Sequence, residues 1–318
     1  MELPSPALAN IPDLLLVNPG AGGGRARAAL PAIRQFAQQQ NWNVEVCVTN
    51  TPQDLVDRAT IAAQAGQKRF FVLGGDGTLQ LLINAVSGFP DIVLGVLPAG
   101  GGNDLAAALG LPRDPLQAAA QLLKSAASPL DAAKVRFADG SERLFVGGGG
   151  VGLDAEASRY ANGPFRNLCG RMRYILAAIR ALFGFHAFRV HIKASSSQLE
   201  DIRSDAFVAA VLNTPSYGAG LYLAPNAQID DGKLNVVVLD RLSLLEILVL
   251  LPALASRGEL RTHRVRRFTA TNVRIETESA RWFQADGELL GLTPVEISIV
   301  PAALRVLRPS QPNPSGCR

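Results

Sequence analysis

Three glycine-rich loops each follow a short apolar run. They are Asn18-Pro19-Gly20-Ala21-Gly22, Gly74-Gly75-Asp76-Gly77-Thr78 and Pro98 to Asp104. Glycine lets a backbone approach a ligand closely, and the N–H groups of such loops can cradle phosphate oxygens. In the second loop Asp76 could act through a divalent cation, and Thr78 is placed to cap the next helix. No Gly-Lys-Ser/Thr follows the first loop, so it is not a P-loop.

Other polar groups leave two interpretations open. In the third loop, Asn103 and Asp104 could bond a nucleotide or shape the loop itself. Asp286 and Glu288 would share a face on a strand, where either carboxylate could accept the proton of an attacking hydroxyl. The alternative for these two is a solvated hairpin turn. Asp231 could join backbone carbonyls around a hard cation, or stand in a β-turn.

A fourth glycine cluster, Gly147 to Gly152, has the G-x-G-x-x-G spacing of a dinucleotide site. That fingerprint also needs an acidic residue about 20 positions later. Residues 157–199 contain neither Asp nor Glu. We therefore interpret this cluster as a close-packed turn.

The apolar runs indicate how these loops are positioned. Strands at 14–17, 44–48, 69–73 and 93–97 alternate with helices at 26–40, 53–64 and 79–86. This order predicts a parallel sheet covered by helices, which binds ligands at the carboxyl ends of its strands. Beyond about residue 130 a mainly antiparallel β domain is predicted, with helices at 171–183 and 244–255. Its strands are expected at 133–137, 144–146, 188–193, 207–213, 234–239, 273–277 and 295–300.

Charge is distributed unevenly along the chain. The 318 residues carry a net charge of only +4, and 48% are apolar, which excludes a disordered chain. Within residues 157–199, which lack Asp and Glu, a basic helix is predicted. Its apolar residues at helical spacing are Met172, Ile175, Leu176, Ile179 and Phe183. Its apolar face would pack on the core, or meet an anionic membrane. A second basic group spans 257–267. Because aromatic interleaving is missing, we expect no nucleic-acid partner.

The three cysteines cannot all pair, and no apolar stretch reaches the roughly 18 residues of a membrane span. No secretory signal is visible at the N-terminus. These features predict a cytoplasmic protein, with peripheral contact at the inner membrane surface as a further expectation.

Together the motifs resemble the diacylglycerol kinase catalytic-domain family, in its bacterial soluble lipid kinase branch. The matching residues, in order, are Val17-Asn18-Pro19 with its glycine loop, 74–78, 98–104, Asp231-Gly232 and 286–288. The resemblance implies an α/β nucleotide-binding domain at 10–130, joined by 300–308. It also implies a β-sandwich lipid-substrate domain at 131–299, and 309–318 is expected to be a disordered tail.

The resemblance also implies ATP and Mg²⁺ as cofactors. The nucleotide would be lined by Asn18, Pro19, Gly20, Ala21, Gly22, Thr49, Gly74, Gly75, Asp76, Gly77, Thr78, Leu79, Gly101, Asn103 and Asp104. Asp231 would hold a structural Mg²⁺ with the carbonyls of Gln228 and Lys233. Glu288 or Asp286 would be the catalytic base, with Asp76 organising Mg²⁺ and phosphates. Gly101 departs from the family, which commonly has Thr there.

The expected reaction is transfer of the γ-phosphate of ATP to a lipid hydroxyl, most simply converting diacylglycerol to phosphatidic acid. One alternative is a kinase acting on a sphingoid base, a phosphatidylglycerol-like lipid or NAD. Another is a non-catalytic nucleotide or lipid sensor. The expected partners are the lipid substrate and an anionic membrane. The sequence leaves open whether the protein forms a homodimer.

Overall fold

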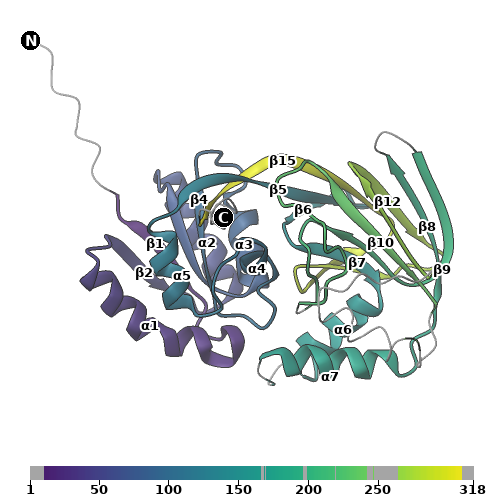
Figure 1. Cartoon of the computed structure of the whole chain (residues 1–318), viewed down its shortest axis with the longest axis horizontal. Coiled ribbons are helices and arrows are strands. Elements are labelled where there is room, and N and C mark those ends of the chain that lie inside the picture. The colour runs from purple at the N-terminus through teal and green to yellow at the C-terminus, as the bar shows by residue number, and fades with distance from the viewer. Residues whose placement is uncertain are drawn as a thin grey trace, which may run out of the picture.

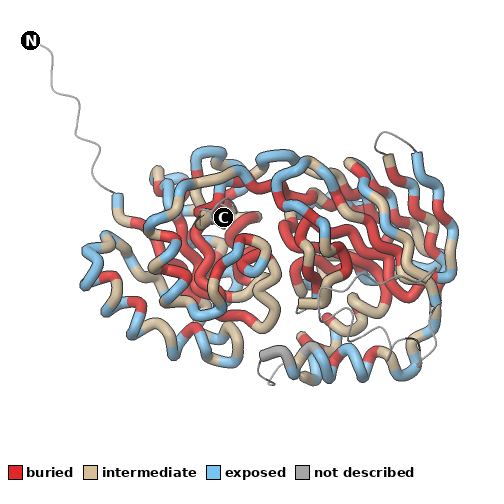
Figure 2. The backbone as a smooth tube through the Cα atoms, in the orientation of Figure 1, coloured by how far each residue is buried: buried red, intermediate tan, exposed pale blue. Residues whose placement is uncertain are grey.

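A computed structural model describes residues 11–165, 168, 170–195, 199–218, 220–241, 246 and 264–309. The predicted helix at 244–255, apart from residue 246, lies outside the described residues, as do residues 257–263 of the second basic group and residues 310–318 of the tail. Two parts of the chain lie side by side, and long strands connect them (Figure 1). Figure 2 shows that each part has its own buried interior.

The N-terminal part is built on four parallel strands in the order β4-β3-β1-β2. Their bounds are β1 Asp13–Val17, β2 Val44–Val48, β3 Arg69–Gly74 and β4 Val93–Pro98. The associated helices are α1 Ala21–Gln39, α2 Pro52–Gln64, α3 Asp76–Val86, α4 Asp104–Ala108 and α5 Pro115–Leu122. The apolar runs of β1 and β3 are buried because helices cover the sheet. This confirms the predicted α/β architecture.

The C-terminal part is mainly antiparallel, as predicted. Its strands are β5 Ala126–Phe137, β6 Glu142–Phe145, β7 Gly148–Gly152, β8 Phe188–Ser195, β9 Leu199–Leu212, β10 Leu234–Asp240, β11 Val265–Ala270, β12 Asn272–Thr277, β13 Trp282–Ala285, β14 Glu288–Leu292 and β15 Val295–Arg308. Its helices are α6 Leu153–Asn162 and α7 Gly170–Leu182. One hydrogen-bonded path runs β14-β13-β7-β9-β8-β12-β15.

Two local predictions are wrong. The glycine cluster at 147–152 contains a fully buried strand, β7, instead of being only a turn. A Cβ at Gly149 would lie 2.6 Å from the Phe283 ring, so glycine is needed for β7 to pack beside β13. Asp286 and Glu288 also do not share a strand face. Asp286 and Gly287 form the turn between β13 and β14, with φ of 49° and 88°.

The two parts are joined by β15, which pairs antiparallel with β5 and then parallel with β4. Asp131, a buried carboxylate on β5, holds this connection together. It accepts the N–H of Ala302 at 2.7 Å and the N–H of Gly232 at 2.7 Å. Ala302 lies in a bulge of β15 and has a positive φ of 49°. A single side chain thus fixes the point where β15 passes from the sandwich to the parallel sheet.

Replacing Asp131 by Ala should lower the free energy of unfolding by about 2 to 5 kcal/mol, because two backbone N–H groups lose a buried, charged acceptor. Urea denaturation measures this change. The control is Asp91→Ala, whose side chain is 76% exposed and forms an ion pair with Lys68. We expect that control to cost less than about 1 kcal/mol. Equal losses in the two variants would contradict the assigned role of Asp131.

Candidate active site

The three glycine loops converge at the carboxyl ends of β1, β3 and β4. A Cβ at Gly75 would lie 2.8 Å from Gly100 Cα, and one at Gly22 would collide with the carbonyl of Ala99. Real Cβ atoms do not approach so closely, so the loops meet here only because glycine has no side chain. The predicted clustering of the loops is therefore present in the structure.

Asn18 connects the first loop to the second. Its Nδ2 donates to Thr78 Oγ1 at 2.9 Å, and its Oδ1 accepts the N–H of Gly20 at 3.1 Å. The expectation that Thr78 caps the next helix is wrong, since α3 begins earlier, at Asp76. The buried Thr78 hydroxyl is instead an acceptor for Asn18.

Asp76 connects the second loop to the third. Its carboxylate accepts the N–H of Asn103 at 2.7 Å and the N–H of Asp104 at 2.9 Å, so it caps the short helix α4. Asn103 has a left-handed backbone and exchanges two side-chain hydrogen bonds with Gly100, at 2.8 and 2.9 Å. Asn103 could bond a nucleotide or shape the loop, and in this structure its side chain shapes the loop.

Carboxylates are concentrated around this junction. Burial, followed by the negative charges of Asp104 and Asp286, holds the pKa of Asp76 well above its ordinary value. Asp104 also accepts a hydrogen bond from Ser216 Oγ at 2.7 Å, and Ser216 belongs to the C-terminal part. Concentrated negative charge of this kind would be relieved by a bound cation. The site therefore has a charge distribution that suits a divalent ion bound with a nucleotide.

The turn between β13 and β14 separates the two candidate bases. Asp286 points into the protein and accepts the N–H groups of Val146, Gly147 and Gly148 at 3.0, 2.9 and 3.1 Å. Burial raises the pKa of Asp286 to about 6 despite these bonds. Both of its oxygens are already occupied by backbone donors.

Glu288 points toward the glycine loops instead. Its Oε1 lies 2.6 Å from the position that a Cβ on Gly77 would occupy. The residue as a whole is exposed, yet desolvation of its carboxylate raises the pKa of Glu288 above its ordinary value, while the charge of Arg173 lowers it. A carboxylate with a raised pKa beside a phosphate-type loop is suited to accepting a proton.

Helices α6 and α7 support the same turn. Asn162 Nδ2 donates to the carbonyl of Gly287 at 2.9 Å, and Arg173 Nε donates to the carbonyl of Ala161 at 2.7 Å. Arg173 also bonds Asn162 Oδ1. The position of Glu288 thus depends on a helix pair distant from it in sequence.

A buried polar cluster beside this turn was not predicted. Tyr217 donates to Asp154 Oδ2 at 2.5 Å, and Gln284 contacts both groups. Gln284 Oε1 also accepts the N–H of Gly287, at 3.3 Å. Burial raises the pKa of Asp154 to about 6 and that of Tyr217 well above its ordinary value. The available sequence signal was Asp154, two residues after the Gly147–Gly152 cluster.

Other predicted residues lie at varied distances from this junction. Thr49 follows β2 and is buried, with its hydroxyl donating to the Val17 carbonyl at 3.0 Å. Leu79 is buried in α3, whereas Pro19, Ala21 and Gly101 are partly exposed in the loops. The nucleotide contacts of these residues stay predictions.

Asp231 stands in a turn, as one of its two interpretations had it. Its Oδ1 accepts the N–H of Lys233 at 3.0 Å, and Gly232 has a φ of 70°. Its exposed carboxylate is an oxygen ligand of the kind that Mg²⁺ prefers, and the participation of the Gln228 and Lys233 carbonyls stays a prediction. Within the described ranges, no group of three or more acidic, His or Cys side chains is arranged for a metal.

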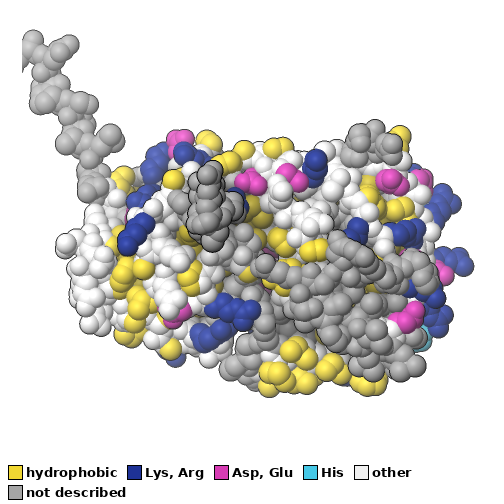
Figure 3. All heavy atoms as spheres, viewed as in Figure 1, with side chains coloured by type: hydrophobic (Ala, Val, Ile, Leu, Met, Phe, Trp, Pro, Cys, Tyr) yellow, Lys and Arg dark blue, Asp and Glu magenta, His cyan; other side chains and the backbone are white. Residues whose placement is uncertain are grey.

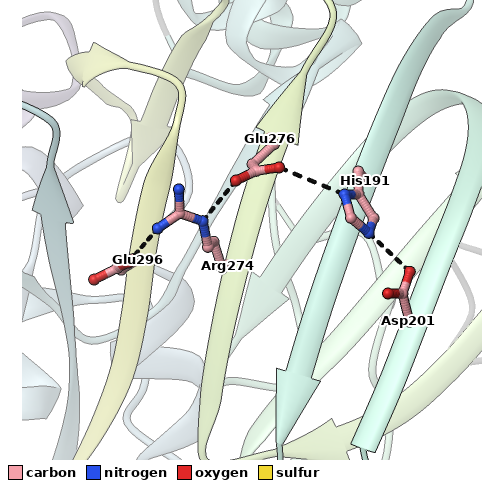
Figure 4. Close-up of polar contacts among 5 residues, drawn as sticks. All are labelled: His191, Asp201, Arg274, Glu276 and Glu296. Carbon is pink, nitrogen blue, oxygen red and sulfur yellow. Dashed lines mark hydrogen bonds and ion pairs between the residues drawn. The ribbon is translucent and has the colours of Figure 1, made fainter.

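A groove on the outer face of the sandwich sheet lies apart from this chemistry. Its lining includes Lys134, Arg136, Lys193, Arg274 and Glu296, and it contains no predicted site residue. Neighbouring side chains there pair in a row from Glu296 through Arg274, Glu276 and His191 to Asp201 (Figure 4). The opposite charges neutralise one another, so we assign the groove no function.

Helix α7 leaves its apolar side chains at the surface. Met172 is 56% exposed, and Ile175, Leu176 and Ile179 are exposed as well, as is Phe183 (66%) directly after the helix. Figure 3 shows an apolar patch over this helix at the lower edge of the molecule. Only Ala177 and Ala181 are buried among the side chains of α7 that the structure describes. Arg171 lies outside the described side chains.

The raised pKa of Asp154 has a consequence for stability. The folded form binds its proton more tightly than the unfolded form, so its contribution is full below about pH 4 and is lost as pH rises through 6. The wild type therefore loses this contribution between pH 4 and pH 7.5, whereas Asp154→Asn has none to lose. The free energy of unfolding of the variant minus that of the wild type should rise by about 1 to 3 kcal/mol over this range. Urea titrations at both pH values measure this. A constant difference between Asp154→Asn and the wild type at the two pH values would refute the prediction.

Comparison with known proteins agrees with the geometry. The sequence-family model of the diacylglycerol kinase catalytic domain matches residues 12–135. The family model of the YegS C-terminal NAD kinase beta sandwich-like domain matches residues 148–308. No helix among the described residues is long and apolar enough to cross a membrane.

Relatives match over nearly the whole chain. A diacylglycerol kinase of Mycobacterium tuberculosis is 32% identical over 92% of this chain and 94% of its own. A diacylglycerol kinase of Bacillus subtilis is 25% identical over 93% of this chain and 96% of its own. A solved structure from Bacillus anthracis superposes with a TM-score of 0.77 at 25% identity, covering 96% of each chain. The loops, the late carboxylate turn and both domain matches therefore place this chain in the diacylglycerol kinase catalytic-domain family.

Proposed function

We propose that the chain is an ATP-dependent lipid kinase that phosphorylates the hydroxyl of diacylglycerol to give phosphatidic acid. The observation that carries the proposal is the approach of the Glu288 carboxylate to Gly77, in the loop that touches Gly100. A proton acceptor and a phosphate-type loop from different parts of the chain thus meet at one place. The names of the relatives support a lipid as the acceptor.

The chemical step follows from this placement. The acceptor hydroxyl oxygen attacks the γ-phosphorus of ATP while its proton moves to the Glu288 carboxylate. The bond between the γ-phosphorus and the bridging oxygen breaks, and ADP leaves. The raised pKa of Glu288 makes its carboxylate a better proton acceptor than a fully solvated glutamate.

Asp286 serves as a positioning residue in this proposal. Its carboxylate is bound by three backbone N–H groups, so it has little capacity to accept a further proton from a substrate. By anchoring the turn on β7, it fixes the direction in which Glu288 points. Gln284 and Asn162 hold the same turn through the N–H and the carbonyl of Gly287.

The glycine loops would bind the phosphates through their backbone N–H groups. Asp76 would then have two roles, as the cap of α4 and as a carboxylate facing the cation of the nucleotide complex. Asp231 with the carbonyls of Gln228 and Lys233 would hold a second, structural ion. Bound Mg²⁺ supplies neutralisation of phosphate charge at the first place and rigidity at the second.

The deciding experiment is transfer from labelled ATP to a panel of diacylglycerol, a sphingoid base, phosphatidylglycerol and NAD. We expect labelled phosphatidic acid as the main product. Label in another lipid or in NAD would replace the proposed acceptor with that compound. Nucleotide binding with no labelled product would identify a sensor instead of a kinase.

Glu288→Gln should reduce kcat by about 10²- to 10⁴-fold, because the amide cannot accept the proton. Steady-state transfer to diacylglycerol measures this, and the affinity for ATP should change little. The matched control is Glu296→Gln, which removes an ion pair on the outer sheet face and should stay within about twofold of the wild type. Retention of full activity by Glu288→Gln would exclude it as the base.

The exposed face of α7 supports peripheral contact with an anionic membrane. Its apolar side chains lie in a segment without acidic residues, and Arg159 and Arg180 are exposed nearby. Burying such side chains in lipid while arginines meet anionic headgroups is the usual arrangement of an interfacial helix. The same helix carries Arg173, which acts on Glu288. The lipid would thereby enter close to the base.

Replacing Ile175 and Ile179 together by Ser should weaken binding to vesicles containing phosphatidylserine by about tenfold or more, since each loses about 1.5 to 3 kcal/mol of apolar transfer. Vesicle sedimentation measures the binding. Leu199→Ser is the control, because this residue is 87% exposed on another part of the sandwich. Unchanged binding of the double variant, or indifference of the wild type to anionic lipid, would exclude α7 as the contact.

A further inference from the structure

The three phosphate-type loops contain one basic side chain between them. Residues 18–25, 74–79 and 98–104 include neither Lys nor Arg except Arg25. We propose that Arg25 binds the β- and γ-phosphates of the nucleotide, an assignment that deepens the proposed function and rests on it.

Arg25 lies where two of the loops meet. Its Nη2 donates to the carbonyl of Gly100, so its guanidinium connects the first loop to the third. The side chain passes over Gly22, where an added Cβ would lie 2.6 Å from Arg25 Nε. Glycine at position 22 therefore leaves the space that Arg25 occupies. The guanidinium position is set by the loops and is not that of a freely rotating surface arginine.

The guanidinium retains donors for a ligand. It carries five N–H donors in a planar fork that matches phosphate oxygens. Its one described hydrogen bond uses Nη2, and Arg25 is an exposed residue. Among the residues that the structure describes, none of the ion pairs involves Arg25. Its positive charge is thus not neutralised by a carboxylate of the described chain.

The surrounding charges make such a cation necessary for a polyphosphate. Negative charge is already concentrated there, since burial and then the charges of Asp104 and Asp286 raise the pKa of Asp76. A nucleotide triphosphate brings further negative charge to the same loops. Bound Mg²⁺ would offset part of it, and Arg25 is the cationic side chain that the loops themselves provide.

Contacts also indicate the direction in which the phosphates lie. Arg25 contacts Gly100, Gly100 lies against Gly75, and Glu288 lies against Gly77 two residues further on. The guanidinium and the proposed base therefore stand at the two ends of one series of contacts through the glycine loops. Phosphates lying along this row have the arginine on one side and the acceptor hydroxyl, held by Glu288, on the other.

The test measures nucleotide binding directly, by calorimetry with ATP, ADP and AMP in the absence of lipid. Arg25→Gln should weaken ATP binding by about tenfold or more, weaken ADP binding less, and leave AMP binding unchanged, because the lost bonds go to the outer phosphates. Arg25→Lys should recover part of the ATP affinity, since it keeps the charge but loses the fork. Arg34→Gln, an exposed residue on the same helix, is the matched control and should bind all three nucleotides as the wild type does.

Equal ATP binding by Arg25→Gln and the wild type would overturn the assignment. So would an equal loss for ATP, ADP and AMP, because that pattern indicates a collapsed loop and not a lost phosphate contact. Thermal unfolding of the variant identifies such a collapse independently. If ATP binding depends on Arg25 but no lipid is phosphorylated, the inference stands and the proposed acceptor is wrong. If lipid is phosphorylated and ATP binding ignores Arg25, only the inference fails.

Discussion

The site depends on missing side chains at a few glycines. Gly75 and Gly100 bring two loops into backbone contact, and Gly77 leaves room for the carboxylate of Glu288. A methyl group at Gly75 or Gly100 would push apart two loops that follow different strands, and one at Gly77 would displace the carboxylate of Glu288. The side-chain bonds of Asn18, Asp76 and Asn103 then hold the contact that glycine allows.

This compactness concentrates negative charge. Asp76, Asp104 and Asp286 lie close enough for burial and mutual repulsion to raise pKa values, and Asp154 is buried nearby. Hydrogen bonds from backbone N–H groups offset part of this cost at Asp76 and Asp286. Such an arrangement is poorly stable by itself and would be stabilised by a bound cation.

The connection between the two parts is equally specific. The sandwich contributes Glu288, Ser216 and the turn at 286–287, whereas the parallel sheet contributes the loops. Asp131 fixes β15 where it passes between them. Helices α6 and α7 brace the Glu288 turn from the outside through Asn162 and Arg173. A change at the exposed face of α7 therefore has a short physical route to the proposed base.

The sequence by itself determined the strand and helix order of the first hundred residues, because buried parallel strands read as apolar runs and glycine loops mark their ends. It also determined that the loops gather at one edge, since parallel strands share a direction. It could not separate Asp286 from Glu288, because their orientations depend on a turn with positive φ at both Asp286 and Gly287. Nor could it show that Asp76 caps α4 or that Asp154, Tyr217 and Gln284 form a cluster, as these contacts join residues far apart in the chain. Whether the apolar stripe of α7 faces core or solvent was likewise decided only by tertiary packing, because helical spacing is the same in both cases.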